Sequence, residues 1–210
     1  MNHLIGQKIA ITSNKPQTTR NNIQGILTTE DAQMVFIDTP GIHKPHHELG
    51  RTLNKSAFSS LAGVDLVYYM VDASVPFGSG EEFVLNNLKE KQLPIFLILN
   101  KVDLLSKEAL MKLLIEWQER LDCKEIFPVS ALKHDNIHEL LEVSKNYLNE
   151  GPKYFPDDMI CDHDEDFMIT ELIREKVLYK TEEEIPHSVA VVLEKKVNKK
   201  SSVVINALII

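Results

Sequence analysis

Residues 34–42 read MVFIDTPGI, an apolar run followed at once by an aspartate and a Pro-Gly turn. The predicted strand covers Gln33 to Ile37, so Asp38 lies at its carboxyl end, where α/β sheets bind ligands. A carboxylate there can hold a water of a hydrated Mg²⁺ ion, and Gly41 permits close approach of the backbone to a phosphate. An ordinary strand ending in an Asp-Pro-Gly turn fits the same residues, so this segment alone leaves both interpretations open.

A second segment, LILNKVDLL at residues 97–105, also places polar residues directly after an apolar run. The predicted strand Ile95 to Leu99 leads into Asn100, Lys101, Val102 and Asp103. Asp103 can accept two hydrogen bonds from the N–H groups on one edge of guanine, which adenine cannot match. The Lys101 stem can cover the base plane, and Asn100 can tie this loop to a neighbouring phosphate-binding loop. The alternative is a polar turn without a binding role. This alternative is less favoured because the segment follows DTPG in the order expected of a nucleotide site.

A third segment, FPVSALK, places Ser130 and Ala131 after the predicted strand Glu125 to Pro128. A Ser-Ala pair is common, and only its position is informative. A base-binding loop from the next strand of the sheet is expected at this point of the chain. A small residue there lets a backbone N–H reach the guanine carbonyl oxygen.

The polar loop from Lys15 to Asn22 is the fourth candidate, and it has no apolar period. Hydroxyls at Thr18 and Thr19 can supply a Mg²⁺ ligand, and Arg20 can contact phosphate. A solvated loop is equally consistent with these residues.

The rest of the first 152 residues alternates apolar runs with helix-period segments, which predicts an α/β fold. A further strand is expected from Leu66 to Val71. Amphipathic helices are indicated by three sets of apolar residues: Leu53, Ala57 and Leu61; Val84, Leu85 and Leu88; and Leu110, Leu113, Leu114, Trp117 and Leu121. Another helix is predicted from Asn136, whose side chain forms a capping box with Glu139, and it closes this domain near Gly151.

Residues 153–166 form a proline-containing acidic stretch that predicts a solvated linker between two domains. The first domain is therefore placed at 1–152 and the second at 167–210. In the second domain, Ile169, Leu172, Ile173 and Val177 indicate a helix. The runs Ser188 to Val197 and Ser201 to Ile210 then predict two strands joined by a turn.

Composition excludes several classes of protein. The chain has 210 residues, 43% of them hydrophobic, and no apolar run approaches the roughly 20 residues that span a bilayer. Its two cysteines, Cys123 and Cys161, are too few for a disulfide framework, so free thiols in the cytoplasm are expected. The net charge of −8 argues against nucleic-acid binding over the whole surface, although a local basic site remains possible.

The ordered set QTTRN, DTPG, NKVD and VSA resembles the motifs of translation-factor-class P-loop GTPases. Residues 6–26, GQKIAITSNKPQTTRNNIQGI, closely resemble the Era subfamily. Residues 167–194 resemble the opening of the KH RNA-binding domain that follows the GTPase domain in Era. This resemblance implies a P-loop GTPase-like, mostly parallel sheet with flanking helices, followed by the start of a KH-type domain.

The resemblance also implies a GTP-hydrolysing switch with GTP and Mg²⁺ as cofactors. Asp38 would position Mg²⁺, with Thr19 as a second ligand. The implied switch loop comprises Gln17, Thr18, Thr19, Arg20 and Asn21, and the implied GTP-binding residues are Asp38, Thr39, Pro40, Gly41, Ile42, Asn100, Lys101, Val102, Asp103, Ser130 and Ala131. Ile42 stands where many GTPases have a water-orienting glutamine, so no catalytic side chain is assigned.

The implied partners are small-subunit ribosomal RNA near its 3′ end and the small ribosomal subunit, whose assembly the protein would assist. Peripheral association with the inner face of the cell membrane is also implied, and no stable oligomer is expected. A basic patch formed by Lys195, Lys196, Lys199 and Lys200 can touch RNA phosphate, although a solvated turn explains it equally. A metal site at His43, His46 and His47 has little support, and a mobile switch is preferred for them.

Two family features have no counterpart in these 210 residues: the G-x-x-x-x-G-K-[S/T] loop and the GXXG loop of KH domains. The expectation is a fragment missing both ends that binds GTP weakly without measurable turnover. We likewise expect it to bind ribosomal RNA poorly and to aggregate through the last predicted strand. The alternative function is a non-hydrolysing module that binds guanine nucleotide or protein.

Overall fold

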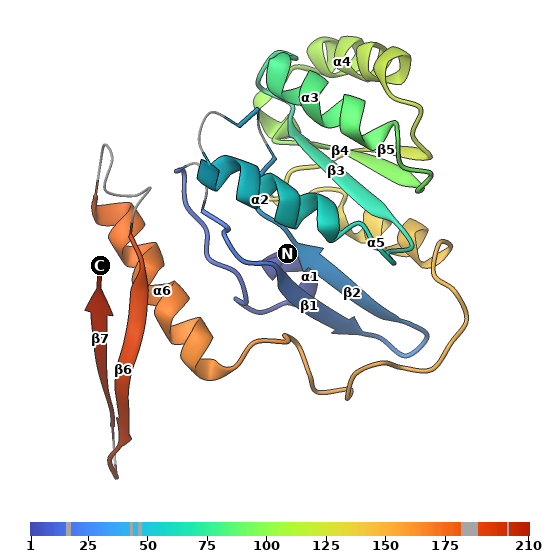
Figure 1. Ribbon diagram of the computed structural model, residues 1–210. Helices are drawn as coiled ribbons and strands as arrows, with labels where there is room; N and C mark the ends of the chain where they lie inside the picture. The colour runs from blue at the N-terminus through green and yellow to red at the C-terminus, as the bar shows by residue number, and fades with distance from the viewer. Residues whose placement is uncertain (16–17, 43, 46–47, 182–188, 201) are drawn as a thin grey trace. The chain divides into compact units, whose positions relative to one another are not determined.

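The computed structural model describes residues 1–210 except 16–17, 43, 46–47, 182–188 and 201 (Figure 1). The described residues form two compact units. One, here called the split unit, comprises Met1–Gly41 and Phe155–Ile210, and the other, the sheet unit, comprises Ile42–Tyr154. These units are defined by contacts in space, whereas the predicted boundaries at 152 and 167 were defined by motifs and composition. The two divisions describe different things, so the domain boundaries stay a prediction.

Three parallel strands form the sheet unit in the order β3 (Val67–Asp72), β4 (Ile95–Asn100) and β5 (Glu125–Pro128). Each lies within one residue of its predicted bounds. Residues 95–99 of β4 are all buried, because a central parallel strand is covered on both faces. The carboxyl ends of the three strands therefore lie on one edge of a well-packed sheet.

Helices cover both faces of this sheet. Tyr69 and Leu97 belong to a core that includes Leu85 of α3 (Ser79–Leu88) and Trp117 of α4 (Lys107–Arg120). On the other face, Phe96 packs against Tyr147, just after α5 (Ile137–Lys145). The fourth helix is α2 (Glu48–Ser59), which buries Leu53 and Ala57. The predicted α/β class with flanking helices is confirmed.

The capping box predicted at Asn136 is wrong. Asn136 precedes α5 with a left-handed backbone, φ 60°, and its side chain makes no cap hydrogen bond to the helix. Its Nδ2 instead donates to the Pro128 carbonyl oxygen at 3.1 Å. The side chain thus fastens the start of α5 to the end of β5, and the helix ends at Lys145 rather than near Gly151.

The split unit begins with a four-residue helix, α1 (Asn2–Ile5), and a hairpin of β1 (Ile23–Thr28) and β2 (Gln33–Asp38). Strand β1 was not predicted. Gly25 interrupts the apolar pattern of β1, and a Cβ there would lie 2.7 Å from Ile9 Cδ1, so the close packing requires glycine. The strand partner of β2 in the described chain is antiparallel β1, not the parallel strand that was expected.

The acidic stretch before α6 (Glu165–Lys180) is not simply solvated. Its backbone continues the hairpin, because the Ile26 N–H donates to the Ile160 carbonyl at 2.9 Å and the Asp162 N–H donates to Gln24 at 3.2 Å. Asp164 caps α6 by accepting from the Phe167 N–H at 2.8 Å. The last two residues of the predicted linker are therefore helical.

The chain continues with an antiparallel hairpin of β6 (Val191–Asn198) and β7 (Val203–Ile209), and α6 packs on β6. Ser188 and Ser201, where the two strands were predicted to start, lie outside the described residues. The side chains Val203, Val204, Ile205, Leu208 and Ile209 of β7 are 38–53% exposed. The predicted aggregation would occur through these exposed apolar side chains, and it stays a prediction. Within the described residues, no helix is both long and apolar enough to cross a membrane.

A buried carboxylate on α6 holds the N-terminal segment of the split unit. Glu175 is 1% exposed, and both its oxygens accept from Lys8 Nζ at 2.7 Å. Glu175 also accepts from the Thr12 N–H at 3.0 Å. Burial alone raises the pKa of Glu175, but the bonds from Lys8 and Thr12 outweigh it and hold the pKa below its usual range.

We expect Glu175→Gln to lower the free energy of unfolding by about 2–3 kcal/mol at pH 7, because it removes a paired, buried charge. A carboxyl whose pKa is depressed by folding stabilises above its unfolded value and loses that contribution as the pH falls through the folded value. The difference from the unsubstituted protein should therefore shrink below about pH 4, as urea unfolding at several pH values would show. Glu142→Gln, at an exposed carboxylate of α5 that pairs with Lys145, should cost at most about 0.5 kcal/mol. A difference that does not change with pH would contradict the role of the charge.

Candidate functional site

The loops after β4 and β5 are joined by one side chain in the sheet unit. Asn100 Oδ1 accepts from the Lys101 N–H at 2.9 Å and from the Ala131 N–H at 3.0 Å. The Val102 N–H donates to the Val129 carbonyl at 3.2 Å and begins the 3-10 helix η1 (Val102–Leu104). Asn100 was expected to reach a phosphate-binding loop, and the structure shows it holding the loop of Ser130 and Ala131 instead.

Lys101 is fixed at both ends. Its backbone is left-handed, with φ 69°, and its Nζ lies 2.6 Å from Asp72 Oδ2 at the end of β3. Asp72 in turn accepts from Ser74 through the N–H at 2.9 Å and the hydroxyl at 2.6 Å. Burial raises the pKa of Asp72, and the bonds from Lys101 and Ser74 together outweigh it, so the pKa lies below its usual range. No role was predicted for Asp72, although it follows a predicted strand as Asp38 does.

Asp103, the predicted guanine-reading residue, has a side chain that is only 9% exposed. Lys133 Nζ lies 3.8 Å from its Oδ2 and is the charged group beside it. Ser130 is fully buried, its Oγ accepts from the Lys133 N–H at 3.2 Å, and its backbone pairs with Asp135. The Ala131 N–H, expected to reach a guanine oxygen, donates to Asn100 in this structure. The loop after β5 is therefore held by several hydrogen bonds, and Lys133 is a member of the site that was not predicted from the sequence.

Two predicted magnesium ligands meet in the split unit. Asp38 ends β2, and the Thr19 hydroxyl lies 3.4 Å from its Oδ2. Burial raises the pKa of Asp38, and the N-terminal ammonium and the Thr19 hydroxyl offset this only in part. In the described part of the chain no three His, Cys, Asp or Glu side chains gather as a metal site. One carboxylate and one hydroxyl do suit Mg²⁺, which protein sites commonly share with substrate phosphates.

The other predicted switch residues make protein contacts. The Thr18 hydroxyl donates to the Lys15 carbonyl at 2.7 Å, and Arg20 Nη1 donates to the Val189 carbonyl at 2.6 Å. Arg20 was expected to contact phosphate, and in this structure its guanidinium holds a segment of the same unit. Gln17, His43, His46 and His47 lie outside the described residues.

The remaining residues of the DTPG segment differ in burial. Pro40 is fully buried, whereas Gly41 is exposed and a Cβ there would meet nothing within 4 Å. Ile42 packs against the core of the sheet unit. The position at which many GTPases have a water-orienting glutamine is therefore taken by an apolar side chain. The predicted site residues thus form two groups, with Asp38 to Gly41 in the split unit and Asn100 to Asp103 with Ser130 and Ala131 in the sheet unit.

One predicted RNA-binding lysine is neutralised by its neighbours. Lys196 Nζ lies 2.5 Å from Glu165 and 2.9 Å from Asp166 at the start of α6. The hydrogen bonds that Lys196 donates to these two carboxylates raise its pKa above the usual range. Lys195, Lys199 and Lys200 are exposed, so three of the four predicted lysines have the accessibility that the prediction requires.

A parallel sheet carrying NKVD and SA loops on one edge, together with a DTPG strand, defines the class as a P-loop-type GTPase. The sequence profile of a family described as 50S ribosome-binding GTPase matches residues 1–101. The structure of Era in complex with MgGDPNP and nucleotides 1506–1542 of 16S ribosomal RNA is 33% identical, with a TM-score of 0.93 over 99% of this chain and 72% of that chain. This chain belongs to the Era family.

A second Era structure agrees with this assignment, and a more distant protein shares the fold. A tyrosine variant of Aquifex aeolicus Era bound to GDP·AlF4⁻ is 34% identical, with a TM-score of 0.92 over 99% of this chain and 72% of that chain. The translation elongation factor SelB from Methanococcus maripaludis, in complex with the GTP analogue GppNHp, is 21% identical. Its TM-score is 0.50 over 64% of this chain and 29% of that chain, and this likeness concerns the fold alone.

Proposed function

We propose that the protein binds GTP together with Mg²⁺ and hydrolyses it as a molecular switch. The observation that carries this proposal is the joined pair of loops after β4 and β5, in which Asn100 holds the Lys101 and Ala131 N–H groups beside Asp103. Asp103 reads the guanine edge, and the Lys101 stem covers the base plane. A base held on this edge places its phosphates beyond the ends of the strands, where α/β folds bind them.

Asp38 and Thr19 are the residues that would hold Mg²⁺ in this proposal. Their proximity supports it, because the Thr19 hydroxyl lies 3.4 Å from Asp38 Oδ2 and both groups are oxygen ligands of the kind Mg²⁺ takes. When bound, Mg²⁺ neutralises charge on the phosphates during transfer. The open space at Gly41 allows its backbone to approach a phosphate without hindrance.

Calorimetric titration with GTP, GDP and ATP, each with and without Mg²⁺, tests the binding, and phosphate release tests the hydrolysis. We expect heat with both guanine nucleotides and none with ATP. Equal affinity for ATP would contradict the proposal. Guanine nucleotide binding without phosphate release would favour the second candidate, a non-hydrolysing module that binds guanine nucleotide.

We further propose that residues 167–210 are the start of a KH-type domain that binds small-subunit ribosomal RNA. The Era complex with 16S ribosomal RNA supports this partner. The succession of α6, β6 and β7 supplies a helix and a two-stranded hairpin, with Lys195, Lys199 and Lys200 exposed on it. The protein would then assist assembly of the small ribosomal subunit in the cytoplasm, with peripheral membrane association.

Salt dependence of RNA binding tests the lysine surface. Replacing Lys195, Lys199 and Lys200 together with Gln should weaken binding of an RNA corresponding to nucleotides 1506–1542 of 16S ribosomal RNA. The slope of log affinity against log salt should fall by up to about 2, since each single-strand phosphate contact contributes about 0.7. Lys112→Gln, at an exposed lysine of α4 in the sheet unit, is the control and should leave the slope unchanged. An unchanged slope in the triple variant would remove these lysines from the interface.

A further inference from the structure

We infer that Asp72 is a positioning residue of the nucleotide site, which holds the Lys101 side chain extended so that its aliphatic stem forms a platform for the purine ring. This inference rests on the proposed binding of guanine nucleotide beside Asp103. The function proposed for the site requires only that Lys101 be near the base. The structure additionally shows what fixes its side chain in one direction.

The fixation is rigid at both ends of the side chain. Asp72 and Asn100 are opposite each other in the parallel register of β3 and β4, so the sheet itself sets the distance between them. Lys101 follows Asn100 directly, and its N–H donates to Asn100 Oδ1 at 2.9 Å. Its Nζ lies 2.6 Å from Asp72 Oδ2, and Asp72 Oδ1 is held by the Ser74 N–H and hydroxyl. Each carboxylate oxygen of Asp72 therefore has a defined partner.

Fold stability does not explain this arrangement well. The side chain of Lys101 is 54% exposed and that of Asp72 31% exposed, and exposed ion pairs contribute little to folding. Holding a lysine in one rotamer also costs conformational entropy. Lys101 adopts a left-handed backbone as well, which residues with a Cβ rarely do. A binding site gains from such ordering, because the entropy of the side chain is lost before the ligand arrives.

Charge also supports a role toward the base rather than the phosphates. The Asp72 carboxylate neutralises the Lys101 ammonium and keeps it at the end of β3. What remains available to a ligand is the hydrocarbon stem, which suits the flat, apolar face of a purine. Asp103, on η1 two residues along the chain, contributes the edge contact. Stem and carboxylate thus recognise two different features of one base.

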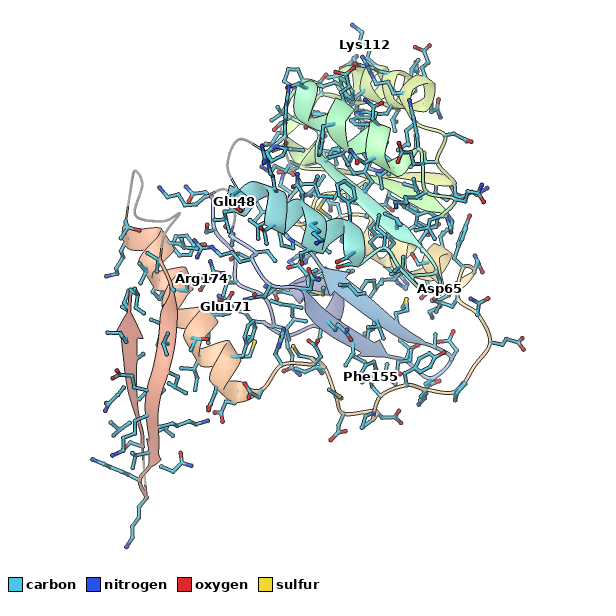
Figure 2. All side chains as sticks on the ribbon, viewed as in Figure 1. Glu48, Asp65, Lys112, Phe155, Glu171 and Arg174 are labelled. Atoms are coloured by element: carbon cyan, nitrogen blue, oxygen red, sulfur yellow. The ribbon has the colours of Figure 1, made fainter. Side chains whose placement is uncertain are left out.

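Affinity for GDP in variants of the whole chain tests the inference. Asp72→Asn should weaken GDP binding about fivefold, and Asp72→Glu should recover part of the loss because it restores a carboxylate. Asp65→Asn is the matched control, since Asp65 precedes the other end of β3 (Figure 2) and accepts a hydrogen bond from Asn149 Nδ2 at 2.6 Å. In a Lys101→Met background, Asp72→Asn should have no further effect. An equal loss in that background would show that Asp72 acts by another route, and the inference would be overturned.

A measurement without nucleotide separates this inference from the function on which it rests. NMR relaxation of the Lys101 Cε and Nζ groups should show a more mobile side chain in Asp72→Asn and no change in Asp65→Asn, with both melting temperatures preserved. Unchanged mobility of Lys101 would overturn the positioning role even if GDP binds tightly. If GDP does not bind the unsubstituted chain, the proposed function fails, and the inferred role toward the base fails with it. GDP binding with unequal effects of the two aspartate variants supports both.

Discussion

Replacing Asp103 with Asn is expected to move the preference of this protein from guanine to xanthine nucleotides, with a change in the affinity ratio of up to about 10⁴. Guanine presents two N–H donors on one edge, and a carboxylate accepts from both. Xanthine presents one donor and one carbonyl oxygen there. An asparagine side chain offers one acceptor and one donor, so it matches xanthine and leaves a guanine donor facing its own N–H₂ group.

The environment of Asp103 is what makes a large effect reasonable. Its side chain is 9% exposed, so water does not readily replace a lost hydrogen bond. Fold stability should change little, because the partner ammonium of Lys133 is 59% exposed and lies 3.8 Å away. A loss of nucleotide binding in Asp103→Asn therefore reports on recognition rather than on unfolding.

Competition between GDP, XDP and ADP for the site measures the change directly. The unsubstituted chain should rank GDP first, and Asp103→Asn should rank XDP first, with melting temperatures that agree within error. Asp122→Asn, at an exposed aspartate after α4, serves as the control and should keep the original ranking. The same ranking in Asp103→Asn and the unsubstituted chain would show that Asp103 does not read the base.

Local sequence pattern predicted much of this site because the chemistry lies directly after strands. The runs before Asn100 and Ser130 contain apolar residues at nearly every position, and the strands observed there begin at the predicted residues. Strand β1 was missed because Gly25 weakens its pattern, and that glycine is required by close packing against Met1, Ile5 and Ile9, which are distant in sequence. Propensity alone does not contain such a contact.

Residues whose role depends on register could not be found from local pattern. Asp72 reaches Lys101 across 29 positions of sequence, and Lys196 reaches Glu165 across 31. Both pairs exist only because strands or a helix and a strand lie side by side. Lys196 therefore looked like part of a basic patch, although its charge is already balanced within the fold.

A buried ion pair on α6 connects that helix to the predicted switch loop within the split unit. Glu171 and Arg174 lie one turn apart on the helix (Figure 2), and Arg174 is 3% exposed. The guanidinium donates to both Glu171 oxygens, at 2.8 and 2.7 Å, and its Nη2 also donates to the Thr18 carbonyl at 2.6 Å. Its buried Nη1 has no hydrogen-bond partner among the described residues. The pair thus holds Thr18, the neighbour of the proposed Mg²⁺ ligand Thr19.

Arg174→Met should lower the free energy of unfolding of the split unit by about 3–5 kcal/mol, because it leaves the Glu171 carboxylate buried without its counter-charge. Glu116→Gln, in an exposed pair with Arg120 on α4, should cost at most about 0.5 kcal/mol. A double variant, Glu171→Leu with Arg174→Met, should recover much of the loss, since an apolar pair removes the buried charge altogether. Urea unfolding would measure the free energy of unfolding of all three variants, and hydrogen exchange of the native proteins would report the stability of α6.

Hydrogen exchange around Thr18 distinguishes support of the helix from support of the loop. In the double variant the helix regains stability, yet the Thr18 carbonyl still lacks its donor from Arg174. Amides around Thr18 and Thr19 should therefore exchange faster than in the unsubstituted chain, while those of α6 exchange at nearly the original rate. If both segments recover together, the bond to Thr18 does not order the loop, and Arg174 serves only to neutralise Glu171. If the loop alone stays open, α6 controls the order of the segment that carries Thr19, and through it the geometry available for Mg²⁺.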